Sequence, residues 1–347
     1  MQEKRVGTPK PWLSFYDEGV PATLNYPVIR LDQLLAESAA KYPGQQAIVF
    51  GARVGSHILD AAMSYQKLDD AVSQLASSLQ QLGVSQGDRV AIVMPNCPQF
   101  VIAYYGILRA GGIAVPCNFL YSESELEHQL ADAGAQVVCV LSPYYQKVHS
   151  IRGGAGLRHV IVTNIKEHFP SLLRLLFTLT KEQKDGHRIE LASPDDLWLK
   201  PLLTDRSLAP RPVEAGAQDT ACLLYTGGTT GIPKGAQLTH RNLVSNALAG
   251  LVWSTAREAS ETTIGALPLF HSYGMTSVMN MCVAGALTMV LIPDPRDILH
   301  IMGSVSKHSA TFYPAVPTLY VAINNHPQVN EFDLRSIRVC LSGAAPL

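Results

Sequence analysis

The sequence is poor in charged residues and has no excess of either sign. Charged side chains make up 16% of the 347 residues, and 27 Lys and Arg stand against 28 Asp and Glu, which leaves a net charge of -1. A nucleic-acid-binding domain normally carries a basic excess, so this balance argues against nucleic acid as a partner. Because 47% of the residues are hydrophobic, disorder is excluded and a large buried core is expected.

Closely spaced cysteines and a secretory leader are also missing. Residues 1–21 contain prolines and aromatics where a signal peptide would have an apolar core of about 7–15 residues. No C-x-x-C metal or redox motif occurs. We interpret the cysteines as reduced core thiols of a cytoplasmic protein. They are Cys97, Cys117, Cys139, Cys222, Cys282 and Cys340.

One stretch has no Asp, Glu, Lys or Arg, between Glu261 and Asp294. A membrane span needs about 20 predominantly apolar residues. Here Asn280 and several Thr and Ser interrupt the run, and Gly285 divides it. We therefore predict a buried helix followed by a buried strand over residues 286–292.

Helix and strand patterns alternate from residue 65 onward, which predicts an α/β fold. Gly83 is expected to end the first helix, and Ser122 with Glu125 forms a capping box for the third. Near-continuous apolar strands separated by helices indicate mostly parallel sheets flanked by helices. Helices are predicted at 65–82, 98–110 and 122–133, and the strands that alternate with them at 89–94, 113–116 and 137–141.

A polar, Pro-rich connection at residues 181–218 divides the chain. We expect a first α/β subdomain with the N-terminal segment in 1–218. A second, incomplete subdomain is expected in 219–347, beginning with the phosphate-binding loop described next.

A loop rich in Gly and Thr, YTGGTTGIPKG at 225–235, follows the apolar strand 221–225. Glycines let the backbone approach an anion closely, and Thr hydroxyls add donors. Lys234 adds a compact positive charge. The loop is not a Walker A motif, because Pro233 precedes the lysine and Gly235 follows it. It is nevertheless predicted to bind phosphate groups.

The segment YTGGTTGIPKGAQLTHRN resembles the signature loop of the adenylate-forming superfamily, which includes acyl-CoA synthetases, peptide-synthetase adenylation domains and firefly luciferase. The usual form has Ser at Gly228 or a close neighbour, and the variant seen here is familiar in bacterial long-chain fatty-acid–CoA ligases. Three later segments agree in order and spacing: PLFHSYGM at 268–275, YPAVPTLY at 313–320 and LSGAAPL at 341–347. The resemblance covers essentially the whole chain. It implies the large N-terminal domain of a five-layered αβαβα fold, truncated, with a small C-terminal domain absent.

The resemblance also implies roles for individual residues. The ATP phosphates would be held by Thr226, Gly227, Gly228, Thr229, Thr230, Gly231 and Lys234. The acyl group would lie against His271, Tyr273, Gly274, Met275, Ala315, Val316 and Pro317. Adenine would lie along Gly343, Ala344, Ala345 and Pro346. The candidate catalytic residues are Lys234, His271 and Thr226, and Thr226 is the candidate Mg²⁺ ligand, its partner Glu being absent from the chain.

The implied reaction activates a carboxylic acid with MgATP to an acyl-adenylate and pyrophosphate, then transfers the acyl group to coenzyme A. The 32 residues from Thr262 to Pro293 contain no carboxylate to pair with a substrate ammonium. An uncharged, apolar acid is therefore favoured over an amino acid. The expected function is a long-chain fatty-acid–CoA ligase. The alternatives are a medium-chain or aryl acid–CoA ligase, a fatty-acyl-AMP ligase, and a non-catalytic nucleotide or acyl binder.

Members of this superfamily run longer, so we expect the chain to be an N-terminal fragment that is inactive alone. Its expected partners are a fatty acid, ATP and coenzyme A, without nucleic acid. The apolar segment 169–181 is either a core helix or a helix on a membrane surface, so peripheral contact with the inner face of the membrane is a hypothesis. A homodimer is another, because an exposed sheet edge favours association.

Overall fold

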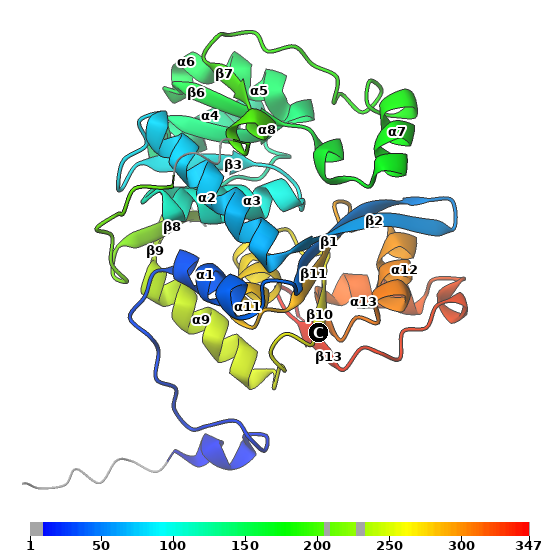
Figure 1. The fold of residues 1–347 in the computed structure, drawn as a ribbon. Coiled ribbons are helices and arrows are strands. Elements are labelled where there is room, and N and C mark those ends of the chain that lie inside the picture. The colour runs from blue at the N-terminus through cyan, green and yellow to red at the C-terminus, as the bar shows by residue number, and fades with distance from the viewer. Residues whose placement is uncertain (1–9, 205–208, 227–232, 347) are drawn as a thin grey trace, which may run out of the picture.

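The computed structural model describes residues 10–204, 209–226 and 233–346, and its strands form two sheets (Figure 1). In the seven-stranded sheet the described neighbours are parallel, apart from the antiparallel pair at one edge, β8 and β9. Its strands, in spatial order, are Asp196–Trp198 (β7), His159–Thr163 (β6), Val137–Leu141 (β5), Arg89–Val93 (β3), Ile113–Pro116 (β4), Thr220–Thr226 (β8) and Lys234–Thr239 (β9).

The six-stranded sheet follows the same plan. Its described neighbours are parallel except for the hairpin of β1 and β2 at one edge. Its strands, in spatial order, are Val339–Ser342 (β13), Phe312–Ala315 (β12), Thr262–Gly265 (β10), Thr288–Leu291 (β11), Gln46–Val54 (β1) and His57–Ser64 (β2).

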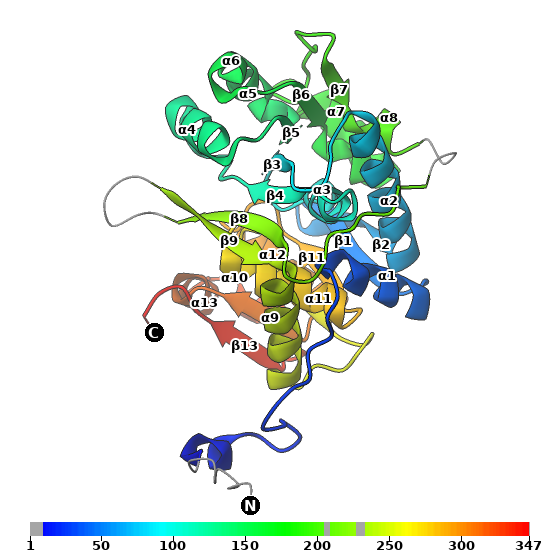
Figure 2. The ribbon, with the colours of Figure 1, turned by 90° about the vertical axis from the view of Figure 1, so that its left-hand side faces the viewer.

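Three clusters of buried side chains hold helices against the sheets in five layers, α/β/α/β/α (Figures 1 and 2). The outer face of the seven-stranded sheet is covered by Glu123–Ala133 (α4), Tyr145–Ser150 (α5) and Arg152–Ala155 (α6). Between the sheets lie Leu31–Lys41 (α1), Tyr65–Gln81 (α2), Pro98–Arg109 (α3), His240–Trp253 (α9) and Met281–Ala284 (α11). The six-stranded sheet is covered by Ile298–His308 (α12) and Pro317–Asn324 (α13). The predicted fold class is confirmed.

The alternation predicted between residues 65 and 141 is confirmed to within one residue at each boundary. Gly83 follows α2 with a φ of 87°, a conformation that suits glycine. Both hydrogen bonds of the capping box between Ser122 and Glu125 are present at α4. Local signals therefore fixed these boundaries well.

The charge-free stretch contains a buried helix and a buried strand, as predicted. The helical part runs through Ser272–Gly274 (α10), a π-helical turn at Met275–Asn280 (η4) and α11, and it ends at Gly285. The strand β11 is shorter than the predicted 286–292. Among the described residues, none of the helices combines the length and apolar character needed to cross a bilayer.

The structure adds detail to the polar connection at 181–218. This connection contains β7 and the short helix Leu199–Leu202 (α8). Backbone pairing with β6 orders this polar segment. Strands also cross the expected boundary at 218: β1 and β2 join the six-stranded sheet, whereas β8 and β9 close the seven-stranded one. The division at 218 therefore describes chain order and not sheet membership.

Five of the six cysteines are buried, and Cys340 is exposed on the edge strand β13, contrary to the prediction. Burial raises the pKa of Cys97, Cys117, Cys139 and Cys282 to about 12, so these groups stay protonated thiols.

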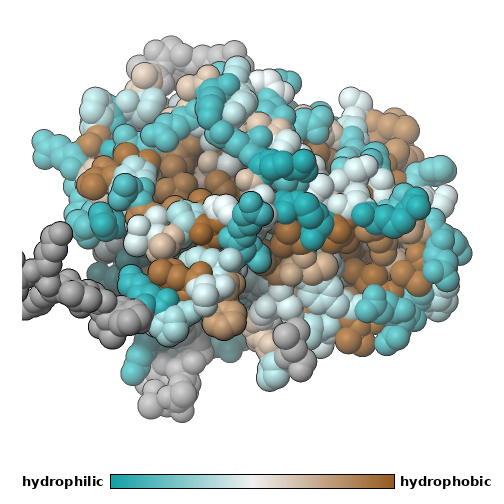
Figure 3. All heavy atoms as spheres, turned by 90° about the horizontal axis from the view of Figure 1, so that it is seen from below, coloured by the Kyte–Doolittle hydropathy of each residue, from teal (hydrophilic) through white to brown (hydrophobic). Residues whose placement is uncertain are grey.

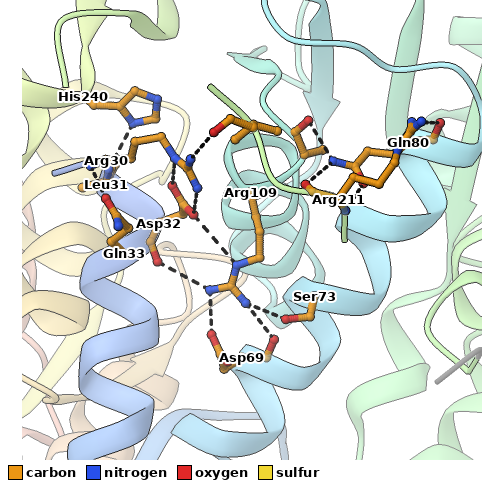
Figure 4. A network of polar contacts seen from close by, with 12 residues as sticks. Arg30, Leu31, Asp32, Gln33, Asp69, Ser73, Gln80, Arg109, Arg211 and His240 are labelled. Carbon is orange, nitrogen blue, oxygen red and sulfur yellow. Dashed lines mark hydrogen bonds and ion pairs between the residues drawn. The ribbon is translucent and has the colours of Figure 1, made fainter. Parts of the chain in front are cut away.

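A buried polar network, here called the helix network, joins α1, α2 and α3 (Figure 4). Asp32, which is 3% exposed, accepts two hydrogen bonds of 2.9 Å from the Arg30 guanidinium. Arg109 of α3 forms an ion pair of 3.9 Å with Asp32. It also donates to Asp69 at 2.6 Å and to Ser73 at 2.7 Å, both on α2. One guanidinium thus connects three helices.

His240, the first residue of α9, connects the same region to the hairpin of β8 and β9. Its Nδ1 accepts the backbone N–H of Leu31 at 3.0 Å (Figure 4). Burial lowers the pKa of His240 to about 4, so the imidazole is neutral and can accept this bond. The cap of α9 is supplied by Thr239 and Asn242.

The surface mixes apolar and polar residues. On the face seen in Figure 3, hydrophobic residues are interspersed with hydrophilic ones. Single exposed apolar residues are ordinary on a folded protein. The helix Ser171–Thr180 (α7), at the periphery in Figure 1, carries three exposed leucines that lie close together in sequence.

Candidate functional site

The Gly- and Thr-rich loop connects two antiparallel strands at the edge of the seven-stranded sheet (Figure 2). Thr226 pairs in register with Lys234, and both residues are exposed. Strand β8 therefore ends one residue later than the predicted strand 221–225, and the sequence did not predict β9, which pairs with β8 along the hairpin. The remaining phosphate-site candidates, Gly227, Gly228, Thr229, Thr230 and Gly231, lie outside the described residues.

Tyr225 anchors the end of this hairpin. Its hydroxyl donates to Asp132 of α4 at 2.6 Å. Burial and the neighbouring carboxylate raise the pKa of Tyr225, so it stays a neutral donor. Its ring also lies 3.1 Å from where a side chain at Gly235 would begin, so glycine allows this close packing. Sequence reasoning missed this contact, since α4 and the hairpin are far apart along the chain.

The other predicted segments, 268–275, 313–320 and 341–346, are here called the strand-end segments. They occupy the carboxyl ends of β10, β12 and β13, which are neighbours in the six-stranded sheet. Ligands of open α/β sheets bind outside the carboxyl ends of the strands. The tertiary structure thus brings together residues that the sequence placed up to about 70 positions apart.

Tyr273 joins two strand-end segments directly. Its hydroxyl donates to the carbonyl of Leu341 at 2.6 Å, and its ring lies 3.1 Å from where a side chain at Gly343 would begin. The N–H of Gly343 donates to Ala315 at 3.4 Å. Ala344, the next residue, has a φ of 64°. The adenine candidates Gly343, Ala344, Ala345 and Pro346 therefore begin beside the acyl candidates.

His271 stands at the N-terminal end of α10. Its carbonyl accepts from Met275 N–H at 2.8 Å, and its ring centroid lies 4.6 Å from that of Phe270. The residue is exposed, yet the neighbouring atoms desolvate the ring enough to lower the pKa of His271. A neutral imidazole beside the strand-end segments can accept or donate a hydrogen bond.

The acyl candidates fall into two groups. Gly274, Met275 and Ala315 are packed in the core, and the sulfur of Met275 accepts a hydrogen bond from Tyr104 at 3.4 Å. The group with accessible surface comprises His271, Tyr273, Val316 and Pro317.

A largely apolar cavity of about 400 Å³ opens where the carboxyl ends of both sheets meet. Phe119 and Phe270 close it from opposite sheets, with ring centroids 5.7 Å apart. Its lining includes none of the predicted acyl residues. The sequence signal was available: each lining segment begins within three residues of the end of an apolar strand. The lining residues lie at 95–96, 119–120, 144, 266–270 and 292–296.

No three His, Cys, Asp or Glu side chains gather into a metal site within the part of the chain that the structure describes. Thr226 offers one exposed oxygen at the mouth of the loop. A magnesium ion that binds with a nucleotide keeps phosphates and waters as most of its ligands, so a single hydroxyl there fits this mode.

The layers and the strand-end segments define the large N-terminal domain of the adenylate-forming fold. A model of the AMP-binding enzyme family matches residues 35–347, and the chain belongs to this family. It is 38% identical over 343 residues to a long-chain-fatty-acid–CoA ligase of Bacillus subtilis, with 97% of this chain and 59% of that protein covered. It is 32% identical to the enzyme of the same name from Salmonella typhimurium, with 97% and 60% covered. The chain thus spans about three fifths of the length of these curated relatives.

Solved structures agree on the fold. A long-chain-fatty-acid–CoA ligase from Archaeoglobus fulgidus superimposes with a TM-score of 0.76 at 26% identity, covering 96% of this chain and 61% of that one. An anthranilate CoA ligase in complex with anthranoyl-AMP superimposes with a TM-score of 0.74 at 22% identity, covering 92% and 56%.

Proposed function

We propose that the full-length protein is a long-chain fatty-acid–CoA ligase. A fatty-acid carboxylate attacks the α-phosphate of ATP, pyrophosphate leaves, and the thiol of coenzyme A then takes the acyl group and releases AMP. The observation that carries this proposal is the convergence of the three strand-end segments on neighbouring strands. The two curated relatives above, which carry this enzyme name, support it.

The first step joins two anions, so its catalysis depends on positioning and on neutralising charge. In this proposal Thr226, Lys234 and the loop between them hold the β- and γ-phosphates, and Lys234 offsets the charge that develops on the leaving pyrophosphate. Thr226 would hold a magnesium ion, which supplies further positive charge at the phosphates. His271 binds the acyl carboxylate and orients it.

The acid is proposed to be apolar. The accessible acyl candidates Tyr273, Val316 and Pro317 offer an uncharged surface, and each buried methylene of a substrate would contribute about 0.8 kcal/mol. Medium-chain and aryl acids are the principal alternatives. A 4-coumarate–CoA ligase of Solanum tuberosum is 29% identical over 317 residues, which keeps the aryl alternative relevant. A fatty-acyl-AMP ligase would differ in the second step.

The test is acid-dependent ATP–pyrophosphate exchange by the full-length protein. Straight-chain acids of about four to eighteen carbons are compared with aryl acids and amino acids, since each methylene should add binding energy. Exchange that rises with chain length supports the proposal. Preference for aryl or amino acids contradicts the apolar chain assignment, and thioester formation with coenzyme A separates a ligase from an acyl-AMP ligase.

Lys234→Ala tests the alternative of a non-catalytic binder. If Lys234 neutralises charge in the transition state, pyrophosphate release by the full-length protein should fall at least about tenfold. Lys10→Ala, which changes an exposed lysine on the N-terminal segment, is the control. An unchanged rate for Lys234→Ala would remove this residue from the mechanism.

We further propose peripheral contact with the membrane through α7. The helix packs Leu173 and Phe177 into the core but leaves Leu172, Leu175 and Leu179 58%, 57% and 73% exposed. Helices that lie in a bilayer interface present such apolar faces beside cationic residues. Arg174 on the helix and Lys181 and Lys184 directly after it are exposed and would favour anionic lipid.

Flotation with anionic vesicles tests this contact. The triple variant Leu172→Ser, Leu175→Ser, Leu179→Ser should float less than the wild type, whereas Val28→Ser, at a residue 74% exposed elsewhere, should float equally. Equal flotation of the triple variant and the wild type contradicts the proposal. Association of two copies through the edge strand β13 stays a prediction.

A further inference from the structure

Asn96 connects the two sheets at the candidate site. It lies in the turn after β3 of the seven-stranded sheet and is 4% exposed. Its Nδ2 donates to the carbonyls of Gly265 at 2.9 Å and Leu267 at 2.8 Å. Its Oδ1 accepts the N–H of Leu269 at 2.9 Å. These partners are backbone groups at the end of β10 and in the segment that follows it.

The carboxamide suits this position chemically. It offers two N–H donors and an acceptor in one plane, and all three functions are used here. The carbonyl of Leu267 and the N–H of Leu269 lie beyond β10, where the strand ladder no longer supplies hydrogen-bond partners. A buried backbone group without a partner is costly, so Asn96 fixes the path of a segment that the sheet no longer holds.

That path determines where two parts of the site lie. Ala266, Pro268 and Phe270 form one wall of the 400 Å³ cavity, and Asn96 itself lines the cavity. His271 follows two residues after Leu269. The hydrogen bonds of Asn96 therefore set the distance between the cavity wall and the opposite sheet, and also the starting point of His271.

We infer that Asn96 is a positioning residue, which acts through the 265–271 segment to hold His271 in place for the acid substrate. This inference rests on the proposed function. Gln99 provides a matched control. It is also a fully buried carboxamide, three residues further on, but its Nε2 donates to the carbonyl of Asn164 at 3.0 Å.

The experiment compares Asn96→Ala with Gln99→Ala in the full-length protein, using hexadecanoic acid as the probe in ATP–pyrophosphate exchange. Asn96→Ala should lower kcat/KM for the acid by about tenfold or more, because buried backbone groups lose their partners. Its KM for ATP should stay near the wild-type value. Gln99→Ala should leave both parameters near wild type even where it lowers Tm equally. Equal kinetic losses in the two variants would overturn the inference.

A pH profile distinguishes positioning from general packing, and it uses a variant of nearly the same shape. In Asn96→Asp a carboxylate would face the carbonyl oxygens of Gly265 and Leu267, which raises its pKa. Protonation restores one donor, so kcat/KM of this variant relative to wild type should recover as the pH falls. A constant ratio across pH would count against the inference.

Hydrogen exchange gives a readout that does not need activity. The Leu269 amide should exchange faster in Asn96→Ala than in the wild type, and at the wild-type rate in Gln99→Ala. If the wild-type protein shows no exchange of pyrophosphate with any acid, the proposed function fails, and the amide data alone then decide whether Asn96 holds the segment. Unchanged protection at Leu269 would overturn the inference.

Discussion

The helix network and the strand-end segments hold together by different means. The helix network is joined by charge: Arg109 contacts two carboxylates and a hydroxyl on two other helices. The strand-end segments are held by hydrogen bonds from uncharged side chains, such as those of Asn96 and Tyr273, to backbone groups. Removing the partner of a buried charge costs more free energy than breaking a hydrogen bond between neutral groups. A neutral hydrogen bond nevertheless fixes the orientation of the groups that it joins. We expect the first region to determine stability and the second to determine activity.

The largest predicted effect breaks the helix network. Arg109→Ala leaves Asp69 without its cation and Asp32 with Arg30 alone, which should lower the free energy of unfolding by about 3 kcal/mol. Urea unfolding measures the change. Arg296→Ala, which breaks an exposed pair with Asp294, should change stability by less than about 1 kcal/mol. Equal losses of stability in Arg109→Ala and Arg296→Ala would show that burial of the helix network adds nothing to the free energy of unfolding.

A smaller predicted effect is the pH dependence of stability that His240 causes. The pKa of His240 is about 4 in the folded protein and near 6.5 when unfolded, so above about pH 6.5 both states are neutral and the residue adds no pH dependence. Below that pH the unfolded state binds the proton first, so the free energy of unfolding decreases as the pH is lowered. At pH 5 this loss should reach at most about 2 kcal/mol.

His240→Asn keeps an acceptor for the Leu31 N–H and does not titrate. Its free energy of unfolding should therefore fall less between pH 7 and pH 5 than that of the wild type, measured by urea unfolding at each pH. His168 and His187, whose pKa values burial also lowers to about 4, are present in both proteins and cancel in the comparison. Identical slopes would contradict the assignment to His240.

The smallest effect on stability is predicted at the strand ends. Tyr273→Phe removes one neutral hydrogen bond to Leu341 and should cost about 1 kcal/mol or less. Because this bond holds the adenine candidates beside the acyl candidates, KM for ATP in the full-length protein should nevertheless rise. Tyr16→Phe, at an aromatic contact with Trp253 outside these segments, is the kinetic control. A normal KM for Tyr273→Phe would weaken the contrast between the two regions.

Much of the local structure could be predicted from the sequence. The alternating elements between 65 and 141 followed from apolar spacing, a capping box and helix-ending glycines. The candidate segments followed from motifs. The prediction failed for Cys340, which has the apolar neighbours of a core residue but lies on an edge strand. It also missed Asn96 and Tyr225, whose partners are about 170 and 93 residues away.

The sequence by itself determined the α/β class and the boundaries of many elements, because these depend on spacing and residue type within a few turns of chain. Only the tertiary structure decided that β1 and β2 join strands more than 200 residues later, and that a carboxamide after β3 holds the segment before His271. Strand partners and buried hydrogen bonds are selected by which distant surfaces pack together, and local sequence carries no record of that choice.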